Sequence, residues 1–212
     1  MPDPTEAGLA LARFTATPLA RDPFDHVVVP GFLDADHARA ARLAFPPIKD
    51  AGLIPAGEGG EDACGRIIAA LRSPIVSEIF GEKFGLRLDP AALMIHLRAR
   101  CRITDGGIHA DSRNKVVTCL LYLNEGWTAE GGRLRLLRSA TDLDDMAAEV
   151  APCDGTLIAF RRTDHSFHGH KPYEGVRRYI MFNWMVDAAA ARREELRHGI
   201  SSGLKRVVAA FG

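Results

Sequence analysis

Residues 109–123 of the chain are His-Ala-Asp-Ser-Arg-Asn-Lys-Val-Val-Thr-Cys-Leu-Leu-Tyr-Leu, a polar cluster followed at once by an apolar run. Alternate residues of a strand point to one face, so His109 and Asp111 can reach the same ion. Taken alone this pair is a weak signal, because the chain has 8 histidines. Together with a distal histidine, His168, it forms two imidazoles and one carboxylate. That set is the facial triad, which binds Fe(II) and leaves positions open for co-substrate and oxygen.

The distal histidine has a neighbour of the same type. His170 lies two residues beyond His168 and shares its face on a strand, so it is an alternative ligand. We favour His168 because it lies in a Ser-x-His context and ten residues before Arg178. His170 is then expected to support the ligands or to face the substrate.

The composition is that of an ordinary globular protein of 212 residues. We expect one domain, with a mixed N-terminal part over about 1–88, a β core over about 89–186 and a helical segment over 187–212. Lys+Arg and Asp+Glu balance at 27 each, which makes a nucleic-acid or membrane partner unexpected. The 4 cysteines form no C-x-x-C pair, as in proteins of a reducing compartment, and we expect a cytoplasmic location.

Apolar residues alternate with a period of two through the middle of the chain, which predicts short strands. We expect these at residues 24–29, 91–101, 115–123, 133–137, 155–160, 166–169 and 177–186. Closely spaced turn signals, with no helices between the strands, predict an antiparallel barrel or a two-sheet jelly roll.

Helical spacing flanks this β region. Asp34 is expected to cap one helix, and Ser73-Pro74 to separate two helices within residues 62–84. Residues 49–61 are expected to form a loop near the barrel mouth, and residues 139–148 an acidic loop or a single helical turn.

Three further segments accompany the His-x-Asp stretch. They are Glu130-Gly-Gly-Arg-Leu-Arg-Leu-Leu137, Pro152-x-x-Gly-Thr-Leu-Ile-Ala-Phe160 and Arg178-Tyr-Ile-Met-Phe-Asn-Trp184. With Ser166-x-His168 between them, residues 90–186 resemble the 2-oxoglutarate- and Fe(II)-dependent oxygenases, in their prolyl-hydroxylase-like branch. Residues 22–48 share the resemblance loosely.

The resemblance implies a double-stranded β-helix (cupin-like) core packed on N-terminal helices. It implies His109, Asp111 and His168 as iron ligands, with Arg178 binding the distal carboxylate of 2-oxoglutarate. O2 is the second co-substrate, and ascorbate an optional reductant. Halogenating relatives replace the ligand carboxylate by a small residue, so Asp111 favours hydroxylation.

The surroundings of the co-substrate follow from strand alternation. Arg178, Phe182 and Trp184 share one face and are expected to form an apolar pocket with one charge at its base, lined also by Cys119 and Leu121. Arg177 points to the other face and is assigned a surface role. Leu121 stands where hypoxia-type prolyl hydroxylases have a co-substrate tyrosine, and Tyr122 is expected to face away.

The substrate is not specified by these patterns. Arg98, Arg100 and Arg102 share a strand face leading to His109, and Arg133 and Arg135 share a face of another strand, so an anionic small molecule or peptide is one hypothesis. The alternative is that these arginines are solvated or paired with the acidic segment 142–149. A non-catalytic, cupin-like sensor of metal and 2-oxo acid and a nucleic-acid demethylase are the competing functions. The chain is expected to be a monomer or a homodimer.

Overall fold

The computed structural model describes residues 3–194 and residue 196 of the chain. The elements follow in the order α1 (Leu11–Ala16), β1 (His26–Val29), α2 (Ala35–Leu43), β2 (Ile54–Pro55), α3 (Ala63–Leu71), α4 (Pro74–Phe84), η1 (Pro90–Ala92), β3 (Leu93–Cys101), β4 (Lys115–Tyr122), β5 (Leu134–Leu137), β6 (Met146–Val150), β7 (Leu157–Arg161), β8 (His168–Gly169) and β9 (Gly175–Met185).

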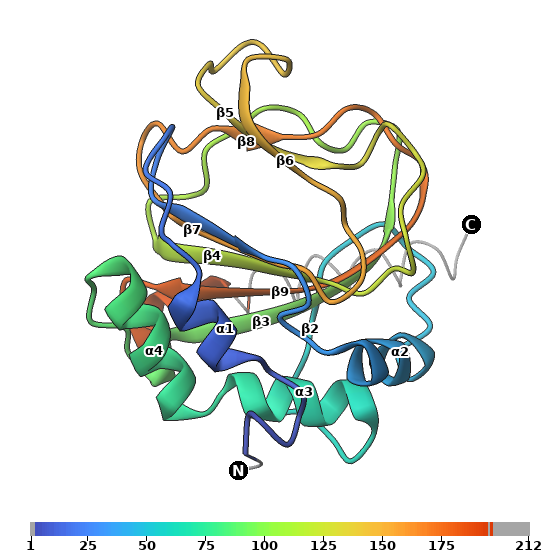
Figure 1. Ribbon diagram of the computed structural model, residues 1–212, viewed down its shortest axis with the longest axis vertical. Helices are drawn as coiled ribbons and strands as arrows, with labels where there is room; N and C mark the ends of the chain where they lie inside the picture. Colours follow the sequence, from blue (N-terminus) through green and yellow to red (C-terminus); the bar gives the residue numbers. More distant parts are fainter. Residues whose placement is uncertain (1–2, 195, 197–212) are drawn as a thin grey trace.

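The strands form two sheets that face each other (Figure 1). The large sheet has the strand order β1-β7-β4-β9-β3-β2, and the small sheet the order β6-β5-β8, with antiparallel pairing throughout these ladders. Helices α1 to α4 cover the outer face of the large sheet, and the small sheet lies over its inner face. This confirms the predicted mainly β, jelly-roll core packed on N-terminal helices.

The two faces of the large sheet bury different residues. Its outer face packs against the helices in a core that we call the helix-side core, which includes Cys119, Leu121, Ile180, Phe182, Trp184, Phe14 and Phe80. Its inner face packs against the small sheet in the inter-sheet core, which includes Leu120, Tyr122, Tyr179, Met181, Ile158, Phe160, Leu134 and Leu136. Neighbouring residues of one strand therefore belong to different cores.

The helix boundaries follow the expected signals. Asp34 accepts a hydrogen bond from the backbone N–H of His37 at the start of α2, and Asp62 caps α3 in the same way. Helix α4 begins with Pro74 and ends at Gly85, whose φ of 63° lies in the left-handed region. These signals mark the starts of α2 and α3 and both ends of α4.

Two loop expectations need correction. Residues 146–150 form β6 rather than a loop, because β5 offers them a pairing partner and Arg135 binds Asp144 and Glu149 beside it. Within the predicted loop 49–61, Ile54 and Pro55 add a short edge strand, β2, to β3. Helical backbone is described over residues 188–194, and the rest of the predicted C-terminal helix lies outside the described residues.

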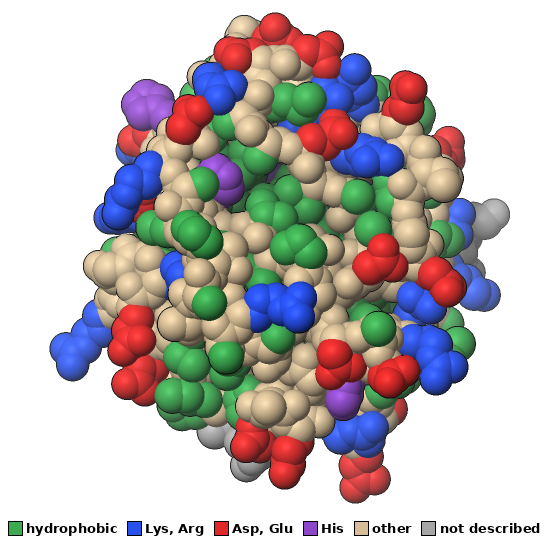
Figure 2. Space-filling model, in the orientation of Figure 1, with side chains coloured by type: hydrophobic (Ala, Val, Ile, Leu, Met, Phe, Trp, Pro, Cys, Tyr) green, Lys and Arg blue, Asp and Glu red, His purple; other side chains and the backbone are tan. Residues whose placement is uncertain are grey.

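The surface has no single-sign field on the face shown in Figure 2, where basic and acidic side chains are interspersed and acidic ones gather over the β5–β6 hairpin at the top. Within the part of the chain that the structure describes, no helix has the length and apolarity needed to cross a bilayer.

The helix-side core centres on Phe80, whose ring centroid lies 4.0 Å from that of Phe14, 5.7 Å from that of Phe182 and 5.2 Å from that of Trp184. We predict that Phe80→Ala lowers the free energy of unfolding by about 3–5 kcal/mol, measured by urea denaturation, because it leaves a cavity there. Leu43→Ala, at a side chain that is 78 % exposed, is the control and should change it by less than about 0.5 kcal/mol. Equal effects of the two substitutions would contradict this description of the core.

Candidate metal centre

Three side chains from two parts of the chain meet at one end of the inter-sheet space. His109 and Asp111 lie between β3 and β4, and His168 opens β8. Their potential ligand atoms all lie within 4.8 Å of one another. The backbones of His109 and His168 pair by two hydrogen bonds of 3.0 Å, which hold the segments together.

Both imidazoles are oriented by the backbone. The Nδ1 atom of His109 lies 2.9 Å from the carbonyl oxygen of Gly107, and that of His168 lies 3.0 Å from the carbonyl oxygen of Ser166. A carbonyl oxygen only accepts, so each Nδ1 has the proton and donates it. Each Nε2 then keeps its lone pair, which is the state of an imidazole that binds a metal.

The carboxylate of Asp111 is held by two donors. Lys115 Nζ lies 2.7 Å from Oδ1, and the hydroxyl of Thr118 donates to Oδ2 over 2.7 Å. Burial alone would raise the pKa of Asp111, but the Lys115 ammonium, His168 and these hydrogen bonds lower it to about 2. Asp111 is therefore ionised at neutral pH.

His168 is 5 % exposed, and its ring lies 4.8 Å from that of Phe160. Burial lowers the pKa of His168 to about 4, against the attraction of Asp111, so the imidazole is neutral at pH 7. A neutral imidazole and an ionised carboxylate are the forms that bind divalent cations. The donor set therefore fits an Fe(II) ion.

The centre has one open side. His109 is exposed and Asp111 half-buried, whereas His168 is buried. A molecule from solution therefore meets the centre at His109, while the opposite side continues into the inter-sheet space.

His170 lies outside this group. Its Nε2 lies 3.7 Å from the Sγ atom of Cys101, and its Nδ1 lies 2.8 Å from the carbonyl oxygen of Lys171. Burial, helped by the nearby positive charge of Arg177, lowers the pKa of His170 to about 4. Within the described residues, the three-residue group suited to a metal contains His168 and not His170.

Arg177 has a buried position, so the surface role predicted for it is wrong. Its side chain is among the buried polar groups at 3 % exposure. Its Nε donates to the carbonyl oxygen of Gly132 over 2.7 Å, and its Nη2 to the hydroxyl of Tyr122 over 3.3 Å. The guanidinium lies 5.3 Å from the ring centroid of Tyr122 and 5.1 Å from that of Tyr179. Tyr122, expected to face away, therefore lies in the inter-sheet space with Arg177.

Arg178 shares its strand face with Ile180, and that face packs on the helices. The other residues predicted to line the co-substrate pocket are fully buried in the helix-side core, namely Cys119, Leu121, Phe182 and Trp184. Trp184 donates from its Nε1 to the hydroxyl of Ser77 on α4 over 3.0 Å. The predicted pocket is thus filled by helix side chains, which sequence alternation alone did not reveal.

The arginines predicted to form a row differ in exposure and pairing. The register shifts between Arg98 and Arg100, but the extra residue lies on β9, so β3 keeps its alternation, with Arg98 half-buried and Arg100 exposed. Arg98 forms an ion pair with Asp105. Arg135 forms ion pairs with Asp144 at 2.5 Å and Glu149 at 2.6 Å, as the alternative interpretation expected for the acidic segment.

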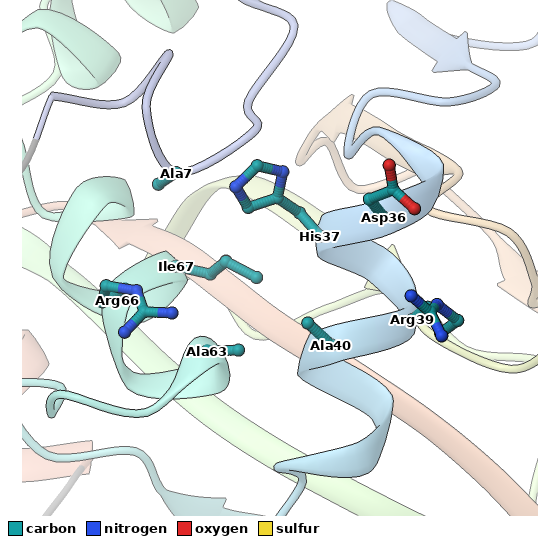
Figure 3. A pocket seen from close by; sticks show the side chains of 8 residues that line it. All are labelled: Ala7, Asp36, His37, Arg39, Ala40, Ala63, Arg66 and Ile67. Atoms are coloured by element: carbon teal, nitrogen blue, oxygen red, sulfur yellow. The ribbon is translucent and has the colours of Figure 1, made fainter.

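A pocket of about 310 Å³ lies elsewhere, between α2 and α3 in the helix layer (Figure 3). It is lined by His37 and Arg39 of α2 and by Arg66 and Ile67 of α3. The large sheet separates this layer from the inter-sheet space, so the pocket is not part of the metal centre.

The two distal histidines can be told apart by metal binding. We predict that His168→Ala lowers the affinity for Mn(II) or Co(II) by more than about 100-fold, because losing a ligand exceeds the usual cost of losing a supporting group. His170→Ala is the matched control and should bind the metal within about tenfold of the wild type. Calorimetric titration measures both, and the reverse result would make His170 the ligand.

Comparison with known proteins agrees with this geometry. A family model described as the 2OG-Fe(II) oxygenase superfamily matches residues 99–186. No curated protein matches the chain in sequence.

Solved structures share the fold. A prolyl-4-hydroxylase from Pseudomonas putida is similar at 21 % identity and a TM-score of 0.57, over 87 % of this chain and 95 % of that one. A prolyl 4-hydroxylase from Phytophthora capsici is similar at 19 % identity and a TM-score of 0.56, over 78 % of this chain and 60 % of that one.

A third structure is a prolyl hydroxylase from Trichoplax adhaerens in complex with a peptide fragment of the hypoxia inducible factor oxygen degradation domain. It is similar at 16 % identity and a TM-score of 0.50, over 89 % of this chain and 92 % of that one. The shared fold, the family match over residues 99–186 and the His/Asp/His group make this chain similar to the 2-oxoglutarate-dependent dioxygenases of the 2OG-Fe(II) oxygenase superfamily.

Proposed function

We propose that the chain hydroxylates a C–H bond of a substrate that reaches the centre from the side of His109. In this proposal His109, Asp111 and His168 hold Fe(II), and Arg177 binds the distal carboxylate of 2-oxoglutarate. The observation that supports it most is the joint position of the metal-binding group and the buried Arg177–Tyr122 pair in one inter-sheet space. When bound, Fe(II) and 2-oxoglutarate supply the oxidising chemistry.

Arg177 suits a dicarboxylate better than Arg178 does. A buried guanidinium binds a carboxylate through two parallel hydrogen bonds, and Arg does this better than Lys. The hydroxyl of Tyr122 adds a hydrogen-bond donor beside this guanidinium. Burial raises the pKa of Tyr122 to about 12 against the opposing effect of Arg177, so the hydroxyl stays protonated at neutral pH. Arg178 lies on the helix-side face of β9, and we assign it no role in binding 2-oxoglutarate.

The ligand-holding residues keep the centre in place before any substrate arrives. The carbonyl groups of Gly107 and Ser166 hold the two imidazoles, and Lys115 and Thr118 hold the carboxylate. Such preorganisation lowers the cost of orientation during the reaction. A bulge separates Lys115 from Val117 on β4, and the side chains of Lys115 and Thr118 both bind Asp111.

A peptide is the substrate class that we test first. The Trichoplax adhaerens structure has a peptide bound, and the two 4-hydroxylases are named for prolyl substrates. The exposed position of His109 leaves room for a bulky substrate at the open side. An anionic small molecule remains the second class.

Turnover tests the proposal directly. We expect Fe(II)-dependent release of succinate from 2-oxoglutarate, increased several-fold by the true substrate, with a mass gain of one oxygen atom in the product. The panel contains proline-containing peptides, acidic small molecules, sugars and nucleotides, each with and without ascorbate. Binding of 2-oxoglutarate without succinate release under any of these conditions would instead favour the sensor.

The assignment of Arg177 gives a second prediction. Arg177→Met should weaken 2-oxoglutarate binding several-hundredfold, because removing one member of a buried ion pair costs about 3–5 kcal/mol. Tyr122→Phe, which preserves the packing, should weaken it about tenfold through the loss of one hydrogen bond to a charged group. Both are measured by calorimetry on the Mn(II)-loaded protein.

Arg178→Met is the matched control for the neighbouring position and should bind 2-oxoglutarate like the wild type. If Arg178→Met abolishes binding and Arg177→Met does not, the original assignment of Arg178 is restored and ours fails.

A further inference from the structure

Asn183 has a fully buried side chain in the middle of β9, at 0 % exposure. Neither its Oδ1 nor its Nδ2 has a hydrogen-bond partner among the described residues. Most buried polar side chains are paired, because an unpaired one has lost its water without replacement. An unpaired carboxamide at this depth points to a ligand that completes it.

Cross-strand pairing places Asn183 beside the metal-binding group. Thr118 lies directly opposite Asn183 on β4, and Phe160 directly opposite Thr118 on β7. Directly opposed residues project from the same face, about 5 Å apart. The hydroxyl of Thr118 donates to Asp111, and the ring of Phe160 lies against that of His168. Asn183 is therefore the next residue in the row that supports the centre.

The position of Asn183 differs from that of the Arg177–Tyr122 pair. Asn183 comes six residues after Arg177 on the same strand, and both odd-numbered side chains lie on the inter-sheet face with Tyr179 and Met181 between them. Arg177 offers a cation away from the ligands, whereas Asn183 offers an uncharged donor and acceptor beside them. The two residues thus suit opposite ends of one elongated ligand.

We propose that Asn183 is a positioning residue for the oxo-carboxylate end of 2-oxoglutarate, to which its Nδ2 donates a hydrogen bond. This inference rests on the proposed function, since it requires the 2-oxo acid at the centre. A carboxamide suits the position because it binds an anionic oxygen without the repulsion of an aspartate.

Oxalate is a probe for the oxo-carboxylate end of 2-oxoglutarate alone. It has the adjoining oxygen donors of the oxo-carboxylate end and lacks the distal carboxylate. We expect Asn183→Leu, which has a similar shape without the amide, to weaken both oxalate and 2-oxoglutarate about 10- to 100-fold on the Mn(II)-loaded protein. Arg177→Met should weaken 2-oxoglutarate and leave oxalate within about threefold of the wild type. Calorimetric titration gives all four affinities.

A purely structural role makes the opposite prediction for stability. If Asn183 waits for a ligand, the metal-free Asn183→Leu protein should melt at the same or a higher temperature than the wild type, because it loses an unpaired buried amide. The rise in melting temperature produced by oxalate should shrink in the variant. A lower melting temperature together with unchanged oxalate affinity would overturn the inference.

A second variant keeps the test decisive if Asn183→Leu does not fold. Asn183→Asp has nearly the same size and should weaken oxalate even more strongly, through charge repulsion. Oxalate and 2-oxoglutarate affinities equal to the wild type in a folded variant would show that Asn183 serves the fold alone. If the wild type loaded with Mn(II) binds neither acid, the proposed function itself fails.

Discussion

Strands β4 and β9 pair through the middle of the large sheet, with Leu121 opposite Ile180 and Tyr122 opposite Tyr179. This register decides which side chains can reach the inter-sheet space. A shift of one residue would exchange the two faces, placing Tyr122 among the helices and Leu121 in the inter-sheet space. Thr118 depends on the same register, since it must face inward to donate to Asp111. The geometry of the centre therefore follows from the pairing of two central strands rather than from the loops alone.

Polar groups in the inter-sheet space are stabilised by one another. Arg177 lies over two tyrosine rings and donates to the carbonyl oxygen of Gly132. Asp111 accepts hydrogen bonds from the Lys115 ammonium and the Thr118 hydroxyl. Burying a charge without such partners would cost several kcal/mol, roughly the stability of a small domain. The helix-side core provides the hydrophobic burial that supports this polar interior.

The strands, the helix caps and the His-x-Asp pair could be predicted from the sequence because each depends on neighbouring residues. The choice between Arg177 and Arg178 could not, because alternation fixes only that they face opposite ways. Which way is inward depends on where the helices dock, and that is a long-range property. The apolar residues Phe182 and Trp184 suggested a pocket, but the same pattern describes a packed core.

The two faces of β9 differ in whether their buried polar side chains have hydrogen-bond partners. On the helix-side face the polar N–H of Trp184 is paired with Ser77, whereas on the inter-sheet face the amide of Asn183 has no partner among the described residues. Residues that serve only the fold gain from full pairing, and residues that wait for a ligand give up some stability. The face with the unpaired amide is also the face with the metal-binding group and the buried arginine. The large sheet thus separates its two tasks, with stability built on the outer face and recognition on the inner one.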